Sequence, residues 1–274
     1  MDMQVQEQSD LARPLAGRVA VVTGSTSGIG LGIARAIAAA GGDVVINGLG
    51  KPDDIERVLA ELESDHPHSH IVYNDANLMK GDEATGLVEQ TIAGFGRVDI
   101  LVNNAGIQHV SPIESFPPEK YEAIIALNLS AAWYTTRAAF ASMKQNGFGR
   151  IINVASAHGL VASPFKSAYV AAKHGVVGLT KTVALEGAEH NVTCNAICPG
   201  YVWTPLVEKQ IDDQAKSHNI ARDAVIRDVF LKNQPTKRFA TVEEMGELAV
   251  FLCSDGAASI TGTALPVDGG WTAH

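Results

Sequence analysis

Tyr169 and Lys173 stand four residues apart in a segment with a helical pattern, Tyr169-Val-Ala-Ala-Lys173. Side chains four positions apart share one face of a helix. A phenol has an ordinary pKa of about 10 and is a poor base at neutral pH, but a nearby ammonium favours the phenolate and lowers that pKa. The pair is therefore a candidate for moving a proton to or from a hydroxyl or carbonyl oxygen. The alternative interpretation is an ordinary exposed pair on a helix.

A glycine-rich segment carries a second kind of chemistry. It consists of Gly24, Ser25, Thr26, Ser27, Gly28, Ile29 and Gly30, and it joins an apolar run to a helical pattern. Glycines let the backbone turn tightly and approach a pyrophosphate, while the helix N-terminus supplies N–H donors and a favourable dipole. The spacing is GxxxGxG rather than GxGxxG, yet its place between a strand and a helix predicts a dinucleotide phosphate site.

Strand-like apolar runs alternate with helical patterns over residues 15–274. We expect strands at 18–23, 43–47, 71–73, 98–102, 150–155, 192–197 and 264–267, and helices at 30–40, 53–64, 83–93, 119–144, 168–187 and 242–253. This alternation predicts right-handed βαβ units. The expected fold is α/β: one Rossmann-type, doubly wound parallel sheet with helices on both faces, in a single domain.

The segment 205–234 breaks this alternation with two polar helical stretches. It follows the carboxyl end of a predicted strand, where open α/β sheets bind their ligands. We therefore expect a helical lid over the substrate; a plain surface excursion is the alternative.

Composition narrows the classes of function. The 274 residues carry a formal net charge of -9, which argues against nucleic acid and anionic membranes as partners. Three cysteines without a CxxC spacing indicate a reducing compartment rather than a disulfide framework. No apolar run reaches the ~18 residues of a membrane helix, and residues 1–14 lack the apolar centre of a secretory signal. We expect a disordered tail at 1–14, a cytoplasmic location and no metal, the histidines at 66, 68 and 70 lying in a solvated loop.

Motifs in a fixed order resemble those of the short-chain dehydrogenase/reductase family over about residues 15–274. They are the glycine loop, Asn103-Asn104-Ala105-Gly106, Asn128, Ser156, the YxxxK of Tyr169 and Lys173, and Cys198-Pro199-Gly200. The resemblance implies that Ser156 orients the reacting oxygen, Tyr169 is the acid/base, Lys173 contacts the nicotinamide ribose and Asn128 anchors a proton-relay water. It further implies a cofactor site made by the glycine loop together with Asn77, Leu78, Asn104, Ala105, Gly106, Tyr169, Lys173, Pro199, Gly200, Val202 and Thr204.

The cofactor preference depends on the end of the second predicted strand. Many NAD-binding proteins carry an acid there that binds the adenosine ribose, but Gly48 is near that place. No arginine follows to hold a 2′-phosphate, and Lys51 is the nearest cation. The absence of a basic clamp favours NAD. After the third strand the family commonly has aspartate; Asn77 stands here, and its carbonyl oxygen is still able to accept from an adenine amino group.

The residues around the catalytic motif closely resemble the D-3-hydroxybutyrate dehydrogenase branch of the family. That resemblance implies that Gln108, His158, Lys166 and Gln210 hold the substrate carboxylate, with Ser156 and Tyr169 at the reacting oxygen and Trp271 near the methyl end. Charge-assisted donors of this kind suit a carboxylate in a partly closed site. Each residue alone has a structural alternative. The family also implies a homotetramer formed through the two long helices. The apolar faces around Trp133-Tyr134 and Val176-Val177 are candidates for that interface, and the alternative is that they belong to the core.

The predicted activity is reversible, NAD-dependent oxidation of (R)-3-hydroxybutyrate to acetoacetate, a small anionic substrate. Two rivals stay open. A 3-oxoacyl carrier-protein reductase would use NADPH and a thioester without a free carboxylate. A non-catalytic dinucleotide-binding regulator would not need the complete set of Asn128, Ser156, Tyr169 and Lys173.

Overall fold

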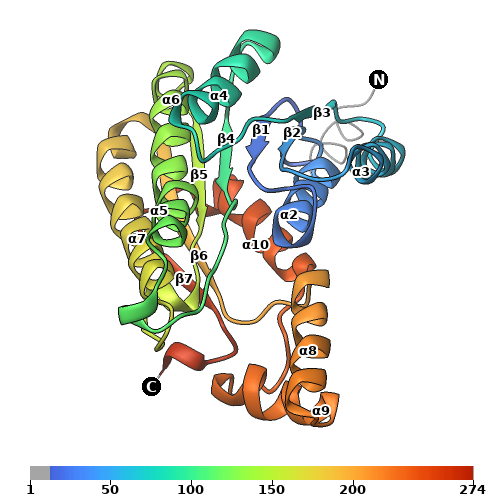
Figure 1. Cartoon of the computed structure of the whole chain (residues 1–274). Helices are drawn as coiled ribbons and strands as arrows, with labels where there is room; N and C mark the ends of the chain where they lie inside the picture. Colours follow the sequence, from blue (N-terminus) through green and yellow to red (C-terminus); the bar gives the residue numbers. More distant parts are fainter. Residues whose placement is uncertain (1–12, 274) are drawn as a thin grey trace.

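The computed structural model describes residues 13–273, apart from the side chains of residues 217 and 218. In this part of the chain, seven parallel strands form one sheet in the order β3-β2-β1-β4-β5-β6-β7 (Figure 1). The order reverses between β1 and β4, and such a reversal opens a crevice at the carboxyl ends of the strands. The predicted doubly wound parallel sheet is confirmed. The tail expected at 1–14 falls almost wholly outside the described residues.

The strands and helices alternate along the chain as the sequence predicts. The strands are β1 (Val19–Val22), β2 (Asp43–Asn47), β3 (Ile71–Asn74), β4 (Ile100–Asn103), β5 (Gly149–Val154), β6 (Val192–Pro199) and β7 (Ala264–Val267). The helices are α2 (Gly28–Ala39), α3 (Pro52–Asp65), α4 (Gly81–Phe95), α5 (Pro118–Ile125), α6 (Ala131–Asn146), α7 (Ser167–Gly187), α8 (Pro205–His218), α9 (Arg222–Val225) and α10 (Val242–Cys253).

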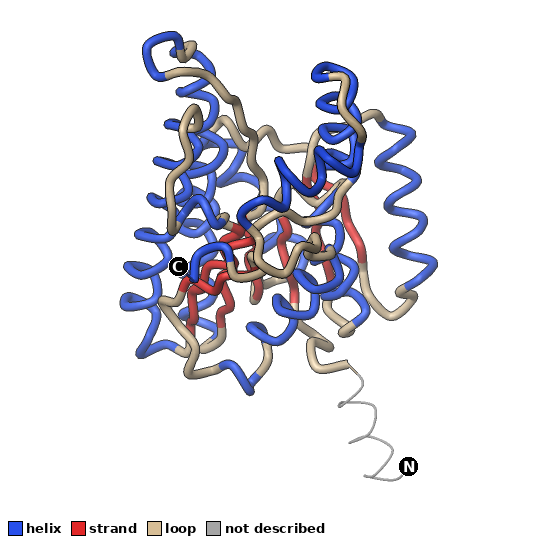
Figure 2. Tube along the Cα trace, turned by 90° about the horizontal axis from the view of Figure 1, so that it is seen from below, coloured by secondary structure: helices blue, strands red, loops and turns tan. Residues whose placement is uncertain are grey.

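Helices cover both faces of the sheet, as Figure 2 shows from below. Successive strand side chains point to opposite faces. Val22 therefore packs with α2 and α10, while its neighbour Val21 packs with α4, α6 and α7. All residues of β1, β4, β5 and β6 are buried, which explains why these strands read as continuous apolar runs rather than as alternating patterns.

The long helix expected at 119–144 is interrupted. A π-helical turn, Ala126–Ser130, separates α5 from α6 and contains the buried Asn128. Such a turn adds one residue to the helical repeat and re-aims the side chains on it, and π turns occur frequently at functional sites. Hydrophobic periodicity does not reveal one inserted residue, so the sequence predicts a continuous helix here.

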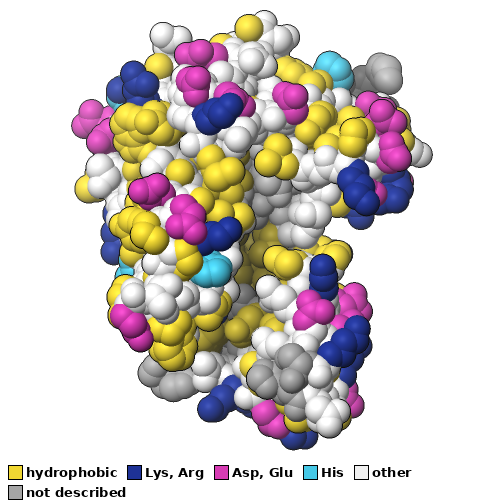
Figure 3. All heavy atoms as spheres, in the orientation of Figure 1, with side chains coloured by type: hydrophobic (Ala, Val, Ile, Leu, Met, Phe, Trp, Pro, Cys, Tyr) yellow, Lys and Arg dark blue, Asp and Glu magenta, His cyan; other side chains and the backbone are white. Residues whose placement is uncertain are grey.

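The inserted segment forms α8, α9 and a second π-helical turn, Ile226–Phe230. It has a small core of its own, made by Ile211, Val225 and Phe230. In Figure 1 these helices stand apart from the sheet at the lower right, and Figure 3 shows the molecular surface hollowed between them and the rest of the chain. Among the described helices, none is long and apolar enough to cross a membrane.

Candidate active site at the carboxyl edge of the sheet

The glycine loop and the Asn-Asn-Ala-Gly segment interlock where the sheet order reverses. Asn104 Nδ2 donates to the carbonyl oxygens of Thr23 and Gly24, both at 2.9 Å. Thr23 Oγ1 accepts from the backbone N–H of Asn104 at 2.9 Å and of Ala105 at 3.1 Å. A Cβ on Gly30 would stand 2.3 Å from the carbonyl oxygen of Gly24. The first turn of α2 therefore packs too closely against the loop for any residue larger than glycine at position 30. No side chain at this position covers the backbone of the loop.

This cradle fits a dinucleotide. Gly24 has a φ of +60°, and a Cβ there would lie 2.8 Å from Ala105 Cα. The loop thus takes a left-handed turn that favours glycine and brings the N-terminus of α2 to the crevice. Thr26, Ser27, Gly28 and Ile29 complete the loop and open α2.

The other predicted cofactor residues lie along the same edge of the sheet. Gly200 follows β6 and donates its backbone N–H to Val267, while Val202 is buried and pairs with Ala240. Thr204 accepts from the backbone N–H of Val207 and caps α8. The remaining members of this set are Leu78, which is buried, Gly106 and Pro199.

Asn77 uses its side chain locally. Its Oδ1, the atom expected to face an adenine amino group, accepts from the backbone N–H of Met79 at 3.1 Å. A carbonyl oxygen has two lone pairs, so the second remains for a ligand. The hydrogen bond with Met79 fixes the orientation of Asn77 Oδ1.

Ser156 and Tyr169 meet at the end of β5. The Tyr169 hydroxyl is hydrogen-bonded to Ser156. Ser156 Oγ also accepts from the backbone N–H of His158 at 3.1 Å and lies 3.5 Å from His158 Nδ1. Because Tyr169 comes from α7 and Ser156 from the loop after β5, this contact depends on how α7 packs against the sheet.

Lys173 is buried one helical turn below Tyr169. Its Nζ donates to the carbonyl oxygen of Val154 at 2.7 Å and lies 5.6 Å from the centre of the Tyr169 ring. Burial lowers the pKa of Lys173 to about 8. The predicted sharing of one helix face is thus realised, with the amine tied to a strand carbonyl.

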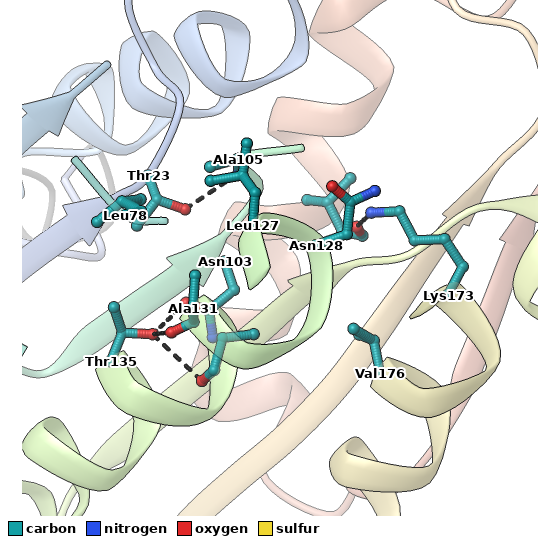
Figure 4. Close-up of a pocket in the computed structure, with 12 residues that line it drawn as sticks. Thr23, Leu78, Asn103, Ala105, Leu127, Asn128, Ala131, Thr135, Lys173 and Val176 are labelled. Atoms are coloured by element: carbon teal, nitrogen blue, oxygen red, sulfur yellow. Dashed lines mark hydrogen bonds between the residues drawn. The ribbon is translucent and has the colours of Figure 1, made fainter. Parts of the chain in front are cut away.

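Asn128 reaches the same place from the π turn. Its Nδ2 donates to the carbonyl oxygen of Ile107, and its Oδ1 accepts from the N–H of that residue, both at 2.9 Å. Figure 4 shows the Lys173 amine extending from α7 toward Asn128. Both residues line a cavity of about 10 Å³, close to the smallest volume that holds one water. The side chain of Asn128 therefore anchors the loop after β4.

His158 lies at the centre of an aromatic cluster beside Tyr169. It is 5% exposed, and its ring centre is 6.1 Å from that of Tyr169 and 5.2 Å from that of Trp271. Its Nε2 is buried without a hydrogen-bond partner among the described residues. Burial lowers the pKa of His158 to about 4, and the charges of Lys166 and His174 act in the same direction. The imidazole is therefore neutral at pH 7, with one nitrogen left for a ligand.

Comparison with known proteins identifies the family. A family profile described as enoyl-(acyl carrier protein) reductase matches residues 24–272. The D-beta-hydroxybutyrate dehydrogenase of Rhizobium meliloti is 57% identical over 257 residues, 94% of this chain and 99% of that protein. The enzyme of the same name from Cupriavidus necator is 52% identical over 260 residues, 95% of this chain and 100% of that protein. The chain belongs to the short-chain dehydrogenase/reductase family.

The solved structures agree with this membership. The crystal structure of levodione reductase matches this short-chain dehydrogenase with a TM-score of 0.87 at 31% identity, covering 94% of this chain and 99% of that one. The protein is thus an oxidoreductase, and membership of the family implies a nicotinamide dinucleotide as its cofactor.

The pKa of Tyr169 departs from the prediction. We expect the Lys173 ammonium to lower it, but in this dehydrogenase burial raises the pKa of Tyr169, and Tyr201 raises it further. The hydrogen bond from Ser156 opposes these effects. Without a ligand the phenol therefore stays protonated at neutral pH. The desolvation of a hydroxyl depends on tertiary packing, which spacing along a helix does not reveal.

Two of the predicted substrate residues are exposed, unlike the buried Ser156 and His158. Gln108 is exposed on the loop after β4, and Gln210 is exposed on α8. Lys166 is half-buried at the N-terminus of α7, where burial lowers its pKa, and it faces His158 closely enough to affect its titration. The structure thus places Ser156 beside His158, with Lys166 close enough to affect the titration of His158, while the two glutamines lie on exposed segments.

Two residues of the site were missed by the sequence analysis. Tyr201 stacks on Trp271 with ring centres 5.9 Å apart and also contacts Phe230 of the inserted segment. Gln234 is 1% exposed; its Oε1 accepts from the backbone N–H of Tyr201 at 2.5 Å and its Nε2 donates to the carbonyl oxygen of Arg238 at 2.8 Å. The only available signal for Tyr201 is its place after Pro199-Gly200; Gln234 gives none.

We expect Gln234→Leu to weaken the attachment of the inserted segment 205–234 to the rest of the domain. The change removes two part-buried hydrogen bonds, to the backbone N–H of Tyr201 and to the carbonyl oxygen of Arg238, which costs about 2 kcal/mol in all. The melting temperature should fall by roughly 5 °C, and limited proteolysis should cleave within 205–234 faster than in the wild type. The exposed Gln90→Leu is the control. Equal cleavage rates in the two variants would contradict the assigned role of Gln234.

Acid should destabilise the protein through His158. The unfolded chain takes up a proton near the ordinary pKa of 6.5, whereas the folded pKa is about 4. Between these values the unfolded state binds more protons, so the free energy of unfolding falls as pH falls from 6.5 toward 4. His158→Phe lacks this contribution and should lose less stability over that range. Melting temperatures of both proteins, measured at steps from pH 7 to 4.5, check this; parallel curves would refute it.

Proposed function

We propose that this dehydrogenase interconverts (R)-3-hydroxybutyrate and acetoacetate with NAD. The observation that carries the proposal is the buried, unpartnered Nε2 of His158, next to the hydrogen-bonded pair of Ser156 and Tyr169. A neutral imidazole with a free N–H suits a carboxylate placed a few atoms from a reacting hydroxyl. The names of the two bacterial relatives support the same substrate.

The carboxylate end of the pocket is assigned to four donors. His158 and Lys166 form its inner part, and Lys166 supplies a positive charge there. Gln108 and Gln210 belong to exposed segments on either side of the crevice. We propose that the segment 205–234 acts as a lid, and that its movement brings Gln210 to the carboxylate. Trp271, in contact with His158, closes the methyl end.

Proton transfer is assigned to Tyr169. In oxidation Tyr169 would act in its phenolate form, which the charges of Lys173 and of a bound oxidised nicotinamide favour, and its Oη would take the proton of the substrate hydroxyl while Ser156 holds the oxygen in place. Lys173 keeps a positive charge below the ring, and Asn128 with the small cavity beside it offers a place for a relay water. The nicotinamide, when bound, supplies the hydride acceptor. In reduction the raised pKa of Tyr169 favours the phenol as proton donor.

A spectrophotometric assay tests the activity. Purified protein is mixed with NAD and (R)-3-hydroxybutyrate, and the reduced-nicotinamide band is followed, with the (S) enantiomer and NADP as parallel reactions. We expect reduction of NAD with the (R) form alone. No signal in any of these reactions, together with oxidation of NADPH by a 3-oxoacyl thioester, would replace the proposal by the reductase alternative.

We also propose that the protein works as a homotetramer in the cytoplasm. Trp133, 47% exposed, lines a hollow of about 580 Å³ between α6 and α7, and Leu185 of α7 is 80% exposed, whereas Val176 and Val177 are buried in the core of the subunit. Apolar side chains gathered on one face are typical of an interface. Light scattering after gel filtration should give four times the 28.9 kDa of the chain, and Leu185→Asp should shift the mass downward; a monomeric wild type would contradict the assembly.

A further inference from the structure

Phe165 has a backbone conformation that is unusual for an aromatic residue. Its φ is +65°, in the left-handed region. Of the described residues other than glycine, three more have a positive φ, namely Asn191, Asn219 and Lys237. The two asparagines each follow a helical segment as its C-cap, a place where asparagine commonly takes this conformation. A bulky side chain is disfavoured there sterically, and such a conformation persists only where the surrounding structure holds it.

The ring of Phe165 does not explain the conformation. Phe165 is 56% exposed and lies in the loop between β5 and α7, directly before Lys166. An exposed side chain makes fewer of the packing contacts that hold a buried residue in place. The reason for the strained conformation therefore lies in what the backbone of this loop contacts.

The carbonyl group of Phe165 joins two loops at the carboxyl edge of the sheet. It accepts a hydrogen bond from the backbone N–H of Ser111 at 2.9 Å. Ser111 belongs to the loop after β4, whereas Phe165 belongs to the loop after β5. Because the two backbone dihedrals of a residue set the direction of its carbonyl group, the left-handed conformation and this hydrogen bond depend on each other.

The loop after β4 is held at two places by hydrogen bonds to its backbone. Asn128 makes two bonds of 2.9 Å with the N–H and the carbonyl oxygen of Ile107. Four residues further on, Ser111 donates to Phe165. Gln108, one of the proposed carboxylate donors, lies between these two anchors. The placement of Gln108 therefore depends on the conformation at position 165.

Lys166, another proposed carboxylate donor, follows Phe165 directly and is the N-cap residue of α7. Its carbonyl oxygen accepts from the backbone N–H of Val170 at 2.9 Å, as the carbonyl group of an N-cap does. Lys166 is half-buried and lies close enough to His158 to affect its titration. The turn at Phe165 therefore sets where the chain enters α7 and where the side chain of Lys166 begins.

We propose that Phe165 is a positioning residue for the carboxylate end of the substrate site. Its left-handed backbone, and not its ring, fixes the loop that carries Gln108 against the loop that carries Lys166. The inference rests on the proposed function for the role of these two donors. Glycine and asparagine tolerate a left-handed backbone and should replace Phe165 without loss, whereas a β-branched residue should not.

Steady-state kinetics separates the backbone from the ring. Phe165→Asn and Phe165→Gly remove the ring and keep the conformation, so KM for (R)-3-hydroxybutyrate should stay within about twofold of the wild type. Phe165→Val disfavours the conformation and should raise KM by about tenfold through misplaced donors. Its kcat and its affinity for NADH should stay within about threefold of the wild type, because Ser156 and the glycine loop are untouched.

Phe251→Val is the matched control, since Phe251 is also an exposed phenylalanine but lies in the regular helix α10. It should leave KM unchanged. A wild-type KM in Phe165→Val would overturn the proposal. An equal rise of KM in the asparagine, glycine and valine variants would also overturn it, because the ring would then be the part that matters.

Amide hydrogen exchange tests the junction between the two loops without any substrate. The N–H of Ser111 should exchange at least about fivefold faster in Phe165→Val than in the wild type, and at the wild-type rate in Phe165→Asn. Equal rates in Phe165→Val and the wild type would contradict the proposal. A wild type that does not oxidise (R)-3-hydroxybutyrate would refute the proposed function, while the exchange rates would still decide whether Phe165 fixes the two loops.

A further pair of variants keeps the test decisive if Phe165→Val does not fold. Phe165→Ala and Phe165→Gly both lack the ring, but alanine is strained where φ is positive. The melting temperature of Phe165→Ala should therefore lie below that of Phe165→Gly, and its Ser111 N–H should exchange faster. Equal melting temperatures and equal exchange rates in the two variants would overturn the role of the left-handed backbone.

Discussion

Replacing Tyr169 by phenylalanine should lower kcat for (R)-3-hydroxybutyrate by about 10³-fold, a typical contribution of general acid–base catalysis. The change removes only the hydroxyl that is hydrogen-bonded to Ser156. The ring keeps its contacts with His158 and its place above the Lys173 amine. NADH affinity, measured by fluorescence, should change by no more than a few-fold, because the glycine loop and the Asn104 contacts are untouched.

Tyr121→Phe is the matched control, since Tyr121 is 49% exposed on α5 and has no role in the chemistry assigned to Tyr169. Its kcat should equal that of the wild type. A Tyr169→Phe protein that retained more than about a tenth of wild-type kcat would contradict the assignment of Tyr169 as the general acid/base. Full biological function without turnover would instead favour the dinucleotide-binding regulator.

His158→Phe should produce the second largest effect, on kcat/KM for the hydroxy acid. A phenylalanine ring is able to make the same aromatic contacts with Tyr169 and Trp271, but it lacks the nitrogen that is proposed to bind the substrate carboxylate. Truncating one partner of a buried, charge-assisted hydrogen bond typically costs several kcal/mol, so kcat/KM should fall by about 10²-fold. The methyl ester of the substrate carries no charge and should show little difference between wild type and variant.

His68→Phe serves as the control, because His68 is exposed in the loop between α3 and β3. It should leave kcat/KM unchanged for both acid and ester. A loss of equal size for acid and ester in His158→Phe would show that His158 supports the geometry of Tyr169 rather than the carboxylate, and the substrate assignment would then rest on Lys166, Gln108 and Gln210.

The sequence by itself determined the sheet and the chemistry of its local motifs. Buried parallel strands such as β1 and β5 appear as unbroken apolar runs, because helices cover both faces. Tyr169 and Lys173 share a face since four residues make about one helical turn. The glycine loop is recognisable in the sequence because a tight turn and the start of a helix are both specified by neighbouring residues.

The tertiary structure decided what depends on packing between distant segments. The close approach of Thr26 to Gly48 comes from the loop after β1 lying against the end of β2. The hydrogen bond from the backbone of Tyr201 to Gln234 joins residues 33 positions apart. The raised pKa of Tyr169 follows from burial, which no spacing encodes. One inserted residue at the π turn aims Asn128 at Ile107. The spacing of apolar residues along the chain shows which face of a helix or strand is buried. The desolvation of individual side chains, and the contacts between elements distant in sequence, are set only when these elements pack together.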